Sequence, residues 1–174
     1  MAILAVNAGS SSLKFSLHPL QDGVAMPSIL TGSIEGLEPQ GSPAMHWITP
    51  TGSQTRQLAQ TNEDSFQLAL QSLRDLLTSL PDFPALRAVA HRVVHGGADF
   101  FQSVMVTEKI LKSLEKLNSL APLHQPHNLA GIRAFQQAFP SVPQIACFDT
   151  AFHASAPLLH QSFALPTELS QQGL

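Results

Sequence analysis

The sequence predicts an α/β fold in which an N-terminal β-meander is followed by alternating helices and strands. Three observations support this prediction. Short apolar runs bounded by Gly, Pro or Ser fill the first part of the chain, leucines at helical spacing follow, and a short buried run comes after each later helix. The chain has 174 residues, of which 44% are hydrophobic and 12% charged, so one well-buried domain is expected.

The meander begins with an apolar strand over residues 1–6 and a partner strand over residues 13–17. The polar stretch between them predicts a tight hairpin turn. Two more strands are predicted over residues 28–34 and 45–49, each bounded by Gly, Pro or Ser. The region 36–53 is rich in Gly, Pro, Ser and Thr and is expected to consist largely of loop.

Helices and strands then alternate. A helix is predicted over residues 62–80, with Thr61 or Asn62 as its cap and Pro81 ending it. The next expected elements are a strand at 87–94 closed by two glycines, helices at 108–120 and 127–138, and a strand at 143–148 that ends at Asp149. Functional side chains often follow such strand ends.

Composition excludes several classes of function. The net charge is −3 and no dense Lys/Arg tract is present, so a nucleic acid or an acidic membrane surface is not an expected partner. No apolar run reaches the roughly 18 residues of a membrane helix, and the N-terminus has no secretory pattern, which predicts a cytoplasmic protein. Cys147 is the single cysteine, so no internal disulfide can form.

The predicted hairpin turn has the composition of a phosphate-binding loop. Gly9 is expected to allow a backbone conformation closed to other residues, and the small Ser10 and Ser12 let main-chain N–H groups approach an anion. Lys14 adds a cation. The stretch is not a common P-loop, because Phe15 follows the lysine where that motif has Ser or Thr. A polar turn with a solvated lysine is the alternative.

Three polar clusters mark the edges of later elements, at residues 91–97, 122–128 and 148–153. Arg92, His124 and Asp149 are the side chains in them that suit phosphoryl transfer, since that reaction needs cations near the phosphoryl oxygens and a carboxylate near Mg²⁺. Two alternatives remain at this point. The histidine spacings 91/95 and 124/127 suit a transition-metal site, and Arg92 with Asp149 suits a structural ion pair.

Four motifs together resemble, in order and spacing, the N-terminal half of the acetate and propionate kinase family: NAGSSSLKF, AHRVVHGG, APLHQPHNLAGI and CFDTAFHASAP. The resemblance implies a mixed five-stranded sheet flanked by helices, the ribonuclease H-like half of the acetate and sugar kinase, Hsp70 and actin superfold. It also implies that residues 1–174 are the N-terminal domain of a two-domain kinase whose C-terminal nucleotide-binding domain is absent from this chain.

The same resemblance implies a role for each matching residue. Asn7 and Asp149 would hold the metal, with Asp149 as the essential acidic residue. Lys14, Ser10 and Ser12 would contact the ATP phosphates. Arg92 would hold the substrate carboxylate and the transferring phosphoryl group, which His124 would support. The walls of the pocket for the acyl methyl group would be Val94 and Leu123.

The implied reaction is reversible phosphoryl transfer from ATP to acetate or another short-chain carboxylate, which gives an acyl phosphate such as acetyl phosphate and ADP. It would depend on Mg²⁺ or Mn²⁺. The parent enzyme would be a homodimer, and this chain alone is expected to be inactive. The alternatives are part of a propionate kinase and a free-standing, non-catalytic domain that binds phosphate or carboxylate or docks on a partner.

Overall fold

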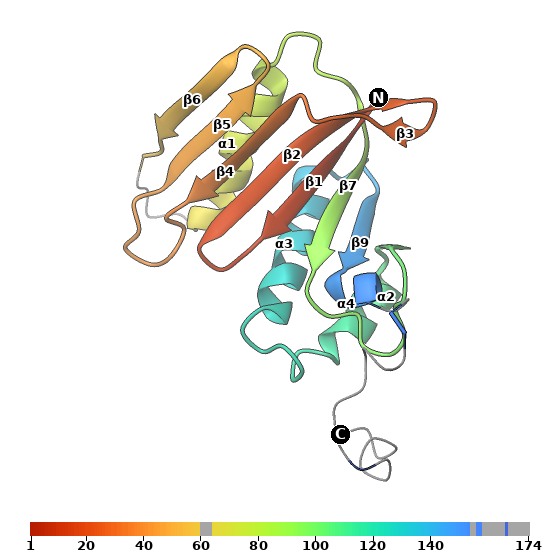
Figure 1. Ribbon diagram of the computed structural model, residues 1–174. Coiled ribbons are helices and arrows are strands. Elements are labelled where there is room, and N and C mark those ends of the chain that lie inside the picture. The colour runs from red at the N-terminus through yellow and green to blue at the C-terminus, as the bar shows by residue number, and fades with distance from the viewer. Residues whose placement is uncertain (60–63, 154–155, 158–165, 167–174) are drawn as a thin grey trace.

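A mixed β-sheet with helices against one face is the main feature of the computed structural model, which describes residues 1–59, 64–153, 156–157 and 166 (Figure 1). Nine strands of these described residues belong to the sheet. They are β1 (Ala2–Ala8), β2 (Ser12–Gln21), β3 (Val24–Ala25), β4 (Leu30–Glu35), β5 (Ala44–Thr49), β6 (Gly52–Gln57), β7 (Leu86–Val93), β8 (Val104–Met105) and β9 (Gln144–Phe148).

The strand order is β6-β5-β4-β2-β1-β7-β9-β8, with β3 paired to β2 alone. The N-terminal strands are antiparallel, whereas β7 lies parallel to both β1 and β9. The mixed sheet is confirmed, and its central strands β4, β2, β1, β7 and β9 number five. The expected total of five is wrong, because β5, β6 and β8 extend the sheet at its edges and β3 adds a short pairing to β2.

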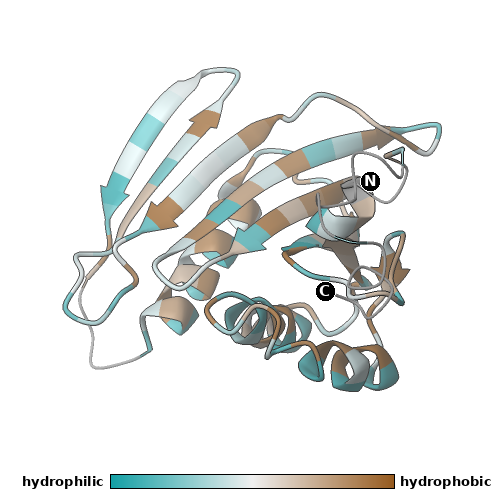
Figure 2. Ribbon diagram, turned by 60° about the horizontal axis from the view of Figure 1, so that its bottom comes forward, coloured by the Kyte–Doolittle hydropathy of each residue, from teal (hydrophilic) through white to brown (hydrophobic). Residues whose placement is uncertain are grey.

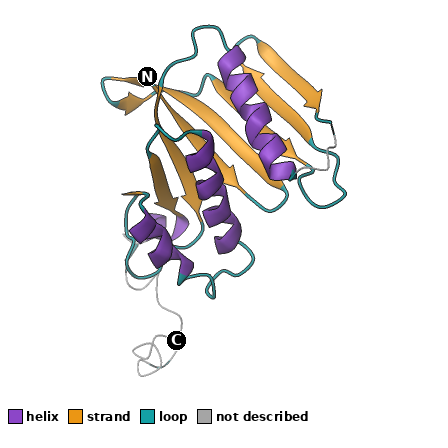
Figure 3. Ribbon diagram, turned by 180° about the vertical axis from the view of Figure 1, so that it is seen from behind, coloured by secondary structure: helices purple, strands orange, loops and turns teal. Residues whose placement is uncertain are grey.

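Helices α1 (Ser65–Ser79) and α3 (Gln125–Ala138) cover one face of the sheet, and α2 (Glu108–Glu115) packs beside α3 (Figure 3). The short α4 (Asp149–His153) follows β9 directly. Each of the three predicted helices needs a boundary corrected, and α3 begins at Gln125, two residues before its predicted start. The cap of α1 is Asp64, whose carboxylate accepts a hydrogen bond from the Phe66 N–H at 2.9 Å, while Thr61 and Asn62 lie outside the described residues. Helix α2 ends at Glu115 and continues only as turns to residue 120.

Strand β6 was not expected, and it removes part of the predicted loop at 36–53. All six of its residues are exposed and none is a large apolar residue, so the alternation that predicts a half-buried strand is missing. Pairing with β5 forms it nonetheless, and Arg56 lies over the Trp47 ring at 5.5 Å. The strand therefore owes its place to cross-strand contacts and not to a buried face.

Alternating burial along the central strands makes the core. Ala2, Leu4, Val6 and Ala8 of β1 face the helices and are buried, while the residues between them are only half-buried. Figure 2 shows the same mixture of hydrophobic and hydrophilic residues along the strands and helices. Within the part of the chain that the structure describes, no helix is long and apolar enough to cross a membrane.

Candidate active site

The carboxyl ends of the three parallel strands place polar side chains on one face of the sheet. Val6 pairs with His91, and both are buried against the helices, so the next residues, Asn7 and Arg92, face the opposite side. Asn7 also pairs with Lys14 across the hairpin, and directly opposed residues share a face. Asp149 follows β9 at the same edge. Four of the predicted site residues therefore occupy neighbouring strand ends.

The predicted hairpin is present between β1 and β2, and the Gly9 N–H closes it on the Ser12 carbonyl at 2.8 Å. The prediction that Gly9 adopts a backbone conformation closed to other residues is wrong. Its φ angle is not positive, and a Cβ there would meet Ser12 O at 3.5 Å, an ordinary contact. Ser10 and Lys14 are exposed and Ser12 is half-buried. The turn thus leaves its polar groups accessible from solvent.

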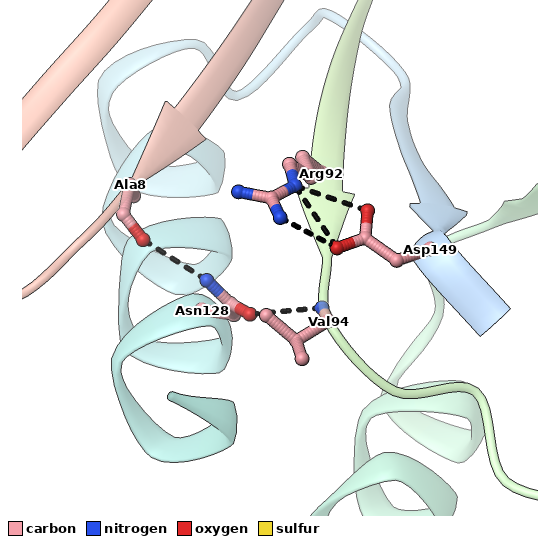
Figure 4. Close-up of polar contacts among 5 residues, drawn as sticks. All are labelled: Ala8, Arg92, Val94, Asn128 and Asp149. Atoms are coloured by element: carbon pink, nitrogen blue, oxygen red, sulfur yellow. Dashed lines mark hydrogen bonds and ion pairs between the residues drawn. The ribbon is translucent and has the colours of Figure 1, made fainter. Parts of the chain in front are cut away.

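Arg92 and Asp149 form a two-pronged ion pair (Figure 4). The Arg92 Nε–H donates to both carboxylate oxygens at 3.0 and 3.1 Å, and Nη2–H donates to Oδ2 at 2.6 Å. The hydrogen bonding of Arg92 to the accepting Asp149 carboxylate is the main reason that the pKa of the Arg92 guanidinium is raised above its ordinary value. The side chains are 54% and 38% exposed, and exposed pairs contribute little to stability. A structural ion pair, the alternative considered from the sequence, would therefore contribute little to the free energy of unfolding.

The loop after β7 is held by side chains from other segments. The Val94 N–H donates to Asn128 Oδ1 at 3.1 Å and the Gly96 N–H donates to Thr150 Oγ1 at 3.0 Å. Gly97 has a φ of 63°, which favours glycine, and a Cβ on Gly96 would meet Phe100 O at 2.8 Å. The two glycines thus let the loop turn tightly beside Arg92.

Leu123 and His124 directly precede α3. His124 is the N-cap residue of α3, but its side chain accepts no capping hydrogen bond. Leu123 is 77% exposed, whereas Val94 is half-buried. Among the described residues, no hydrogen bond or ion pair joins His124 or Lys14 to Arg92 or Asp149. The start of α3 lies at the same end of the sheet as Arg92, because Asn128 in its first turn bonds to Ala8 and Val94.

The geometry does not support the transition-metal alternative. The buried His91 Nε2 lies 2.7 Å from Gln144 Oε1, and burial lowers the pKa of His91 to about 4. His95 instead accepts a hydrogen bond from the Gly97 N–H. The described residues contain no group of three or more His, Cys, Asp or Glu side chains that could hold a metal ion.

Sequence reasoning missed three side chains that hold this end of the sheet. Asn128 contacts both β1 and the segment after β7, Gln125 Nε2 donates to the His95 carbonyl at 3.1 Å, and Thr150 anchors Gly96. Each bonds to backbone at least 30 residues away. No local pattern signals such contacts, although all three residues lie inside the motifs of the family resemblance.

Comparisons with known proteins agree with the four motifs. A family model described as the acetokinase family matches residues 2–174. Acetate kinases from Oceanobacillus iheyensis and a Geobacillus species are 39% and 42% identical to the chain over 98% and 95% of its length. The chain spans only 42% and 41% of those two proteins.

Solved structures give the same result. A propionate kinase from Francisella tularensis is 34% identical with a TM-score of 0.81, over 99% of this chain and 43% of that one. An acetate kinase from Porphyromonas gingivalis is 28% identical with a TM-score of 0.77, over 98% of this chain and 43% of that one. These similarities confirm the predicted resemblance and fold class, and they cover well under half of each relative.

Proposed function

The chain belongs to the acetokinase family, and on this premise we propose that it forms part of a phosphotransferase that moves a phosphoryl group reversibly between ATP and a short-chain carboxylate such as acetate. The products in the forward direction are the acyl phosphate and ADP. The observation that carries the proposal is the row of Lys14, Asn7, Arg92 and Asp149 at one edge of the sheet, where β1, β7 and β9 end and the antiparallel β2 begins. Ligands bind at this edge of α/β sheets.

Arg92 is the residue proposed to hold the carboxylate substrate. A guanidinium is planar and can donate two parallel hydrogen bonds to a carboxylate, as it already does to Asp149. Its exposed side chain and its position beside the hairpin suit contact with both the carboxylate and the transferring phosphoryl group. Lys14 and the Ser10 and Ser12 turn are proposed to face the ATP phosphates, where the lysine offsets negative charge.

Asp149 and Asn7 are the residues proposed to hold Mg²⁺ or Mn²⁺. The donor chemistry fits, because both offer oxygen atoms from the same sheet edge, and Mg²⁺ needs few protein ligands when phosphates and waters complete its shell. The metal would neutralise charge on the phosphate oxygens when bound. Asp149 also orients the Arg92 guanidinium directly through the ion pair.

The remaining site residues are assigned to the acyl group and the phosphoryl group. Val94 and Leu123 are proposed as walls for the acyl methyl group, and His124 as support for the phosphoryl group. Acetate and propionate differ by one methylene, worth only about 1–3 kcal/mol in a pocket, so the substrate is assigned as a short-chain carboxylate with acetate as its first member.

We place this chain as the N-terminal domain of a two-domain, cytoplasmic and homodimeric kinase. Closure of the second domain over the exposed Arg92 and Lys14 would exclude water that competes for the phosphoryl group. The adenosine site would then come from outside these 174 residues. On this proposal the chain alone has no kinase activity.

The test is acyl phosphate formation, trapped as the hydroxamate, from ATP, Mg²⁺ and acetate or propionate. The complete gene product is expected to form it, and the 174-residue chain is expected to form none. Full turnover by the short chain would contradict the two-domain assignment. Absence of acyl phosphate with the complete product would contradict the kinase assignment and favour a non-catalytic binding domain.

A further inference from the structure

Asn128 joins the ends of the two central parallel strands (Figure 4). It lies in the first turn of α3, where its Nδ2–H donates to the Ala8 carbonyl at 3.0 Å and its Oδ1 accepts from the Val94 N–H at 3.1 Å. The residue is only 6% exposed. Both polar atoms of a buried carboxamide are therefore bonded to backbone groups, one in β1 and one in the residue that follows β7.

The bridge stands where the backbone pairing of β1 and β7 ends. Their ladder stops at the pair Val6 and His91. If the register continued, Ala8 would lie opposite Val93, and its carbonyl would face the N–H of Val94. In the structure the Asn128 carboxamide lies between these two groups instead, so two hydrogen bonds replace a direct one. The side chain therefore sets how far apart the strand ends lie.

The packing of α3 on β1 lets Asn128 reach both strands. Gly131 is one helical turn further along, and a Cβ there would meet the Ala8 Cβ at 2.6 Å. Only glycine allows the helix to approach so closely. The Asn128 N–H also donates to the His124 carbonyl at 2.9 Å, and Gln125 ties the same turn to His95. The start of α3 is thus anchored to both strands.

We propose that Asn128 is a positioning residue of the phosphoryl-transfer site. It fixes the separation between the hairpin, assigned to the ATP phosphates, and Arg92, assigned to the carboxylate substrate. This inference rests on the proposed function. Asn128 is assigned no contact with either substrate, because it is buried and already bonds to Ala8 and Val94.

The chemistry of the bridge specifies asparagine. Asn128→Asp keeps an acceptor for Val94 but puts a carboxylate against the Ala8 carbonyl and removes the donor. Asn128→Leu keeps a similar volume and leaves both backbone groups unpaired. Gln144→Leu is a matched control, because Gln144 is also a buried carboxamide with two hydrogen bonds, to His91 and the Val142 carbonyl, but lies at the opposite end of the parallel strands.

Amide hydrogen exchange of the 174-residue chain tests the bridge itself. The Val94 amide should exchange roughly tenfold faster in Asn128→Leu, relative to core amides that exchange only on global unfolding, because this variant removes its acceptor. In Gln144→Leu the exchange rate of Val94 relative to those core amides should stay as in the wild type. Unchanged relative protection of Val94 in Asn128→Leu would overturn the proposal.

Steady-state kinetics of the complete gene product test the role in the site. Because each half-site stays intact while their separation changes, kcat should fall roughly tenfold to a hundredfold in both Asn128 variants, with KM for ATP and for acetate little altered. Gln144→Leu should keep its kcat below its unfolding temperature. An equal kcat loss in Gln144→Leu, or no loss in Asn128→Leu, would overturn the inference. An inactive wild type would instead contradict the proposed function, and the exchange result would still decide whether the bridge exists.

Discussion

The Arg92 guanidinium holds both carboxylate oxygens of Asp149, yet neither side chain is buried. Arg92 lies near the end of β7 and Asp149 directly follows β9, and the pair forms because these parallel strands end at the same edge of the sheet. A pair open to water can exchange its partners at low cost, which a substrate-binding arginine needs and a structural ion pair does not.

Asp149→Asn should change stability little and abolish turnover. The carboxylate is 38% exposed, so its ion pair is expected to contribute about 1 kcal/mol or less to the free energy of unfolding. Urea denaturation followed by the fluorescence of Trp47, the only tryptophan, measures this. A loss of about 3 kcal/mol or more would identify the pair as a structural one instead.

His91 should make the protein less stable in acid. Its pKa is about 4 in the folded chain, against an ordinary value of 6.5, so between these values the unfolded state binds more protons. Stability from the neutral imidazole is therefore complete above about pH 6.5 and is lost as the pH falls toward 4. Unfolding free energies at about pH 7 and about pH 4.5 should differ by about 2 kcal/mol more in the wild type than in His91→Gln. An equal pH dependence in the two proteins would contradict this account.

Gly131→Ala should destabilise the chain through its contact with Ala8. The added Cβ would lie 2.6 Å from the Ala8 Cβ, and such overpacking costs about 1–3 kcal/mol, against a gain in helix propensity of about 1 kcal/mol. Combining it with Ala8→Gly removes the clash. The double variant should be more stable than the sum of the single changes predicts, by about 1 kcal/mol. Additive effects would show that the contact relaxes without cost.

Much of the fold is predictable because its signals are local. The alternation in β1, the leucine spacing of α1 and the buried run of β9 predict those elements directly. Strand β6 has no buried face, so only its pairing with β5 reveals it. The cap of α1 shows the same limit, since the sequence offers several capping residue types there and does not decide which one caps: Thr61, Asn62, Asp64 and Ser65.

The candidate site also contains both residues that the sequence reveals and residues that only the folded structure reveals. Arg92 and Asp149 stand out in the sequence because each lies at the end of a buried strand run. Asn128 does not, because its role depends on Ala8, 120 residues earlier, and on the point where two strands stop pairing. Such contacts are properties of the folded chain, and only the strand register reveals them.

The turnover of Arg92→Ala in the complete gene product tests the central claim most directly, with Arg133→Ala as the control. Arg133 is also an ion-paired arginine, bound to Glu108 and Glu115, but it joins α3 to α2. Acyl phosphate formation should fall roughly a hundredfold to a thousandfold in Arg92→Ala, with the free energy of unfolding within about 1 kcal/mol of the wild type. Arg133→Ala should keep wild-type turnover. Equal turnover in Arg92→Ala and the wild type would contradict the account.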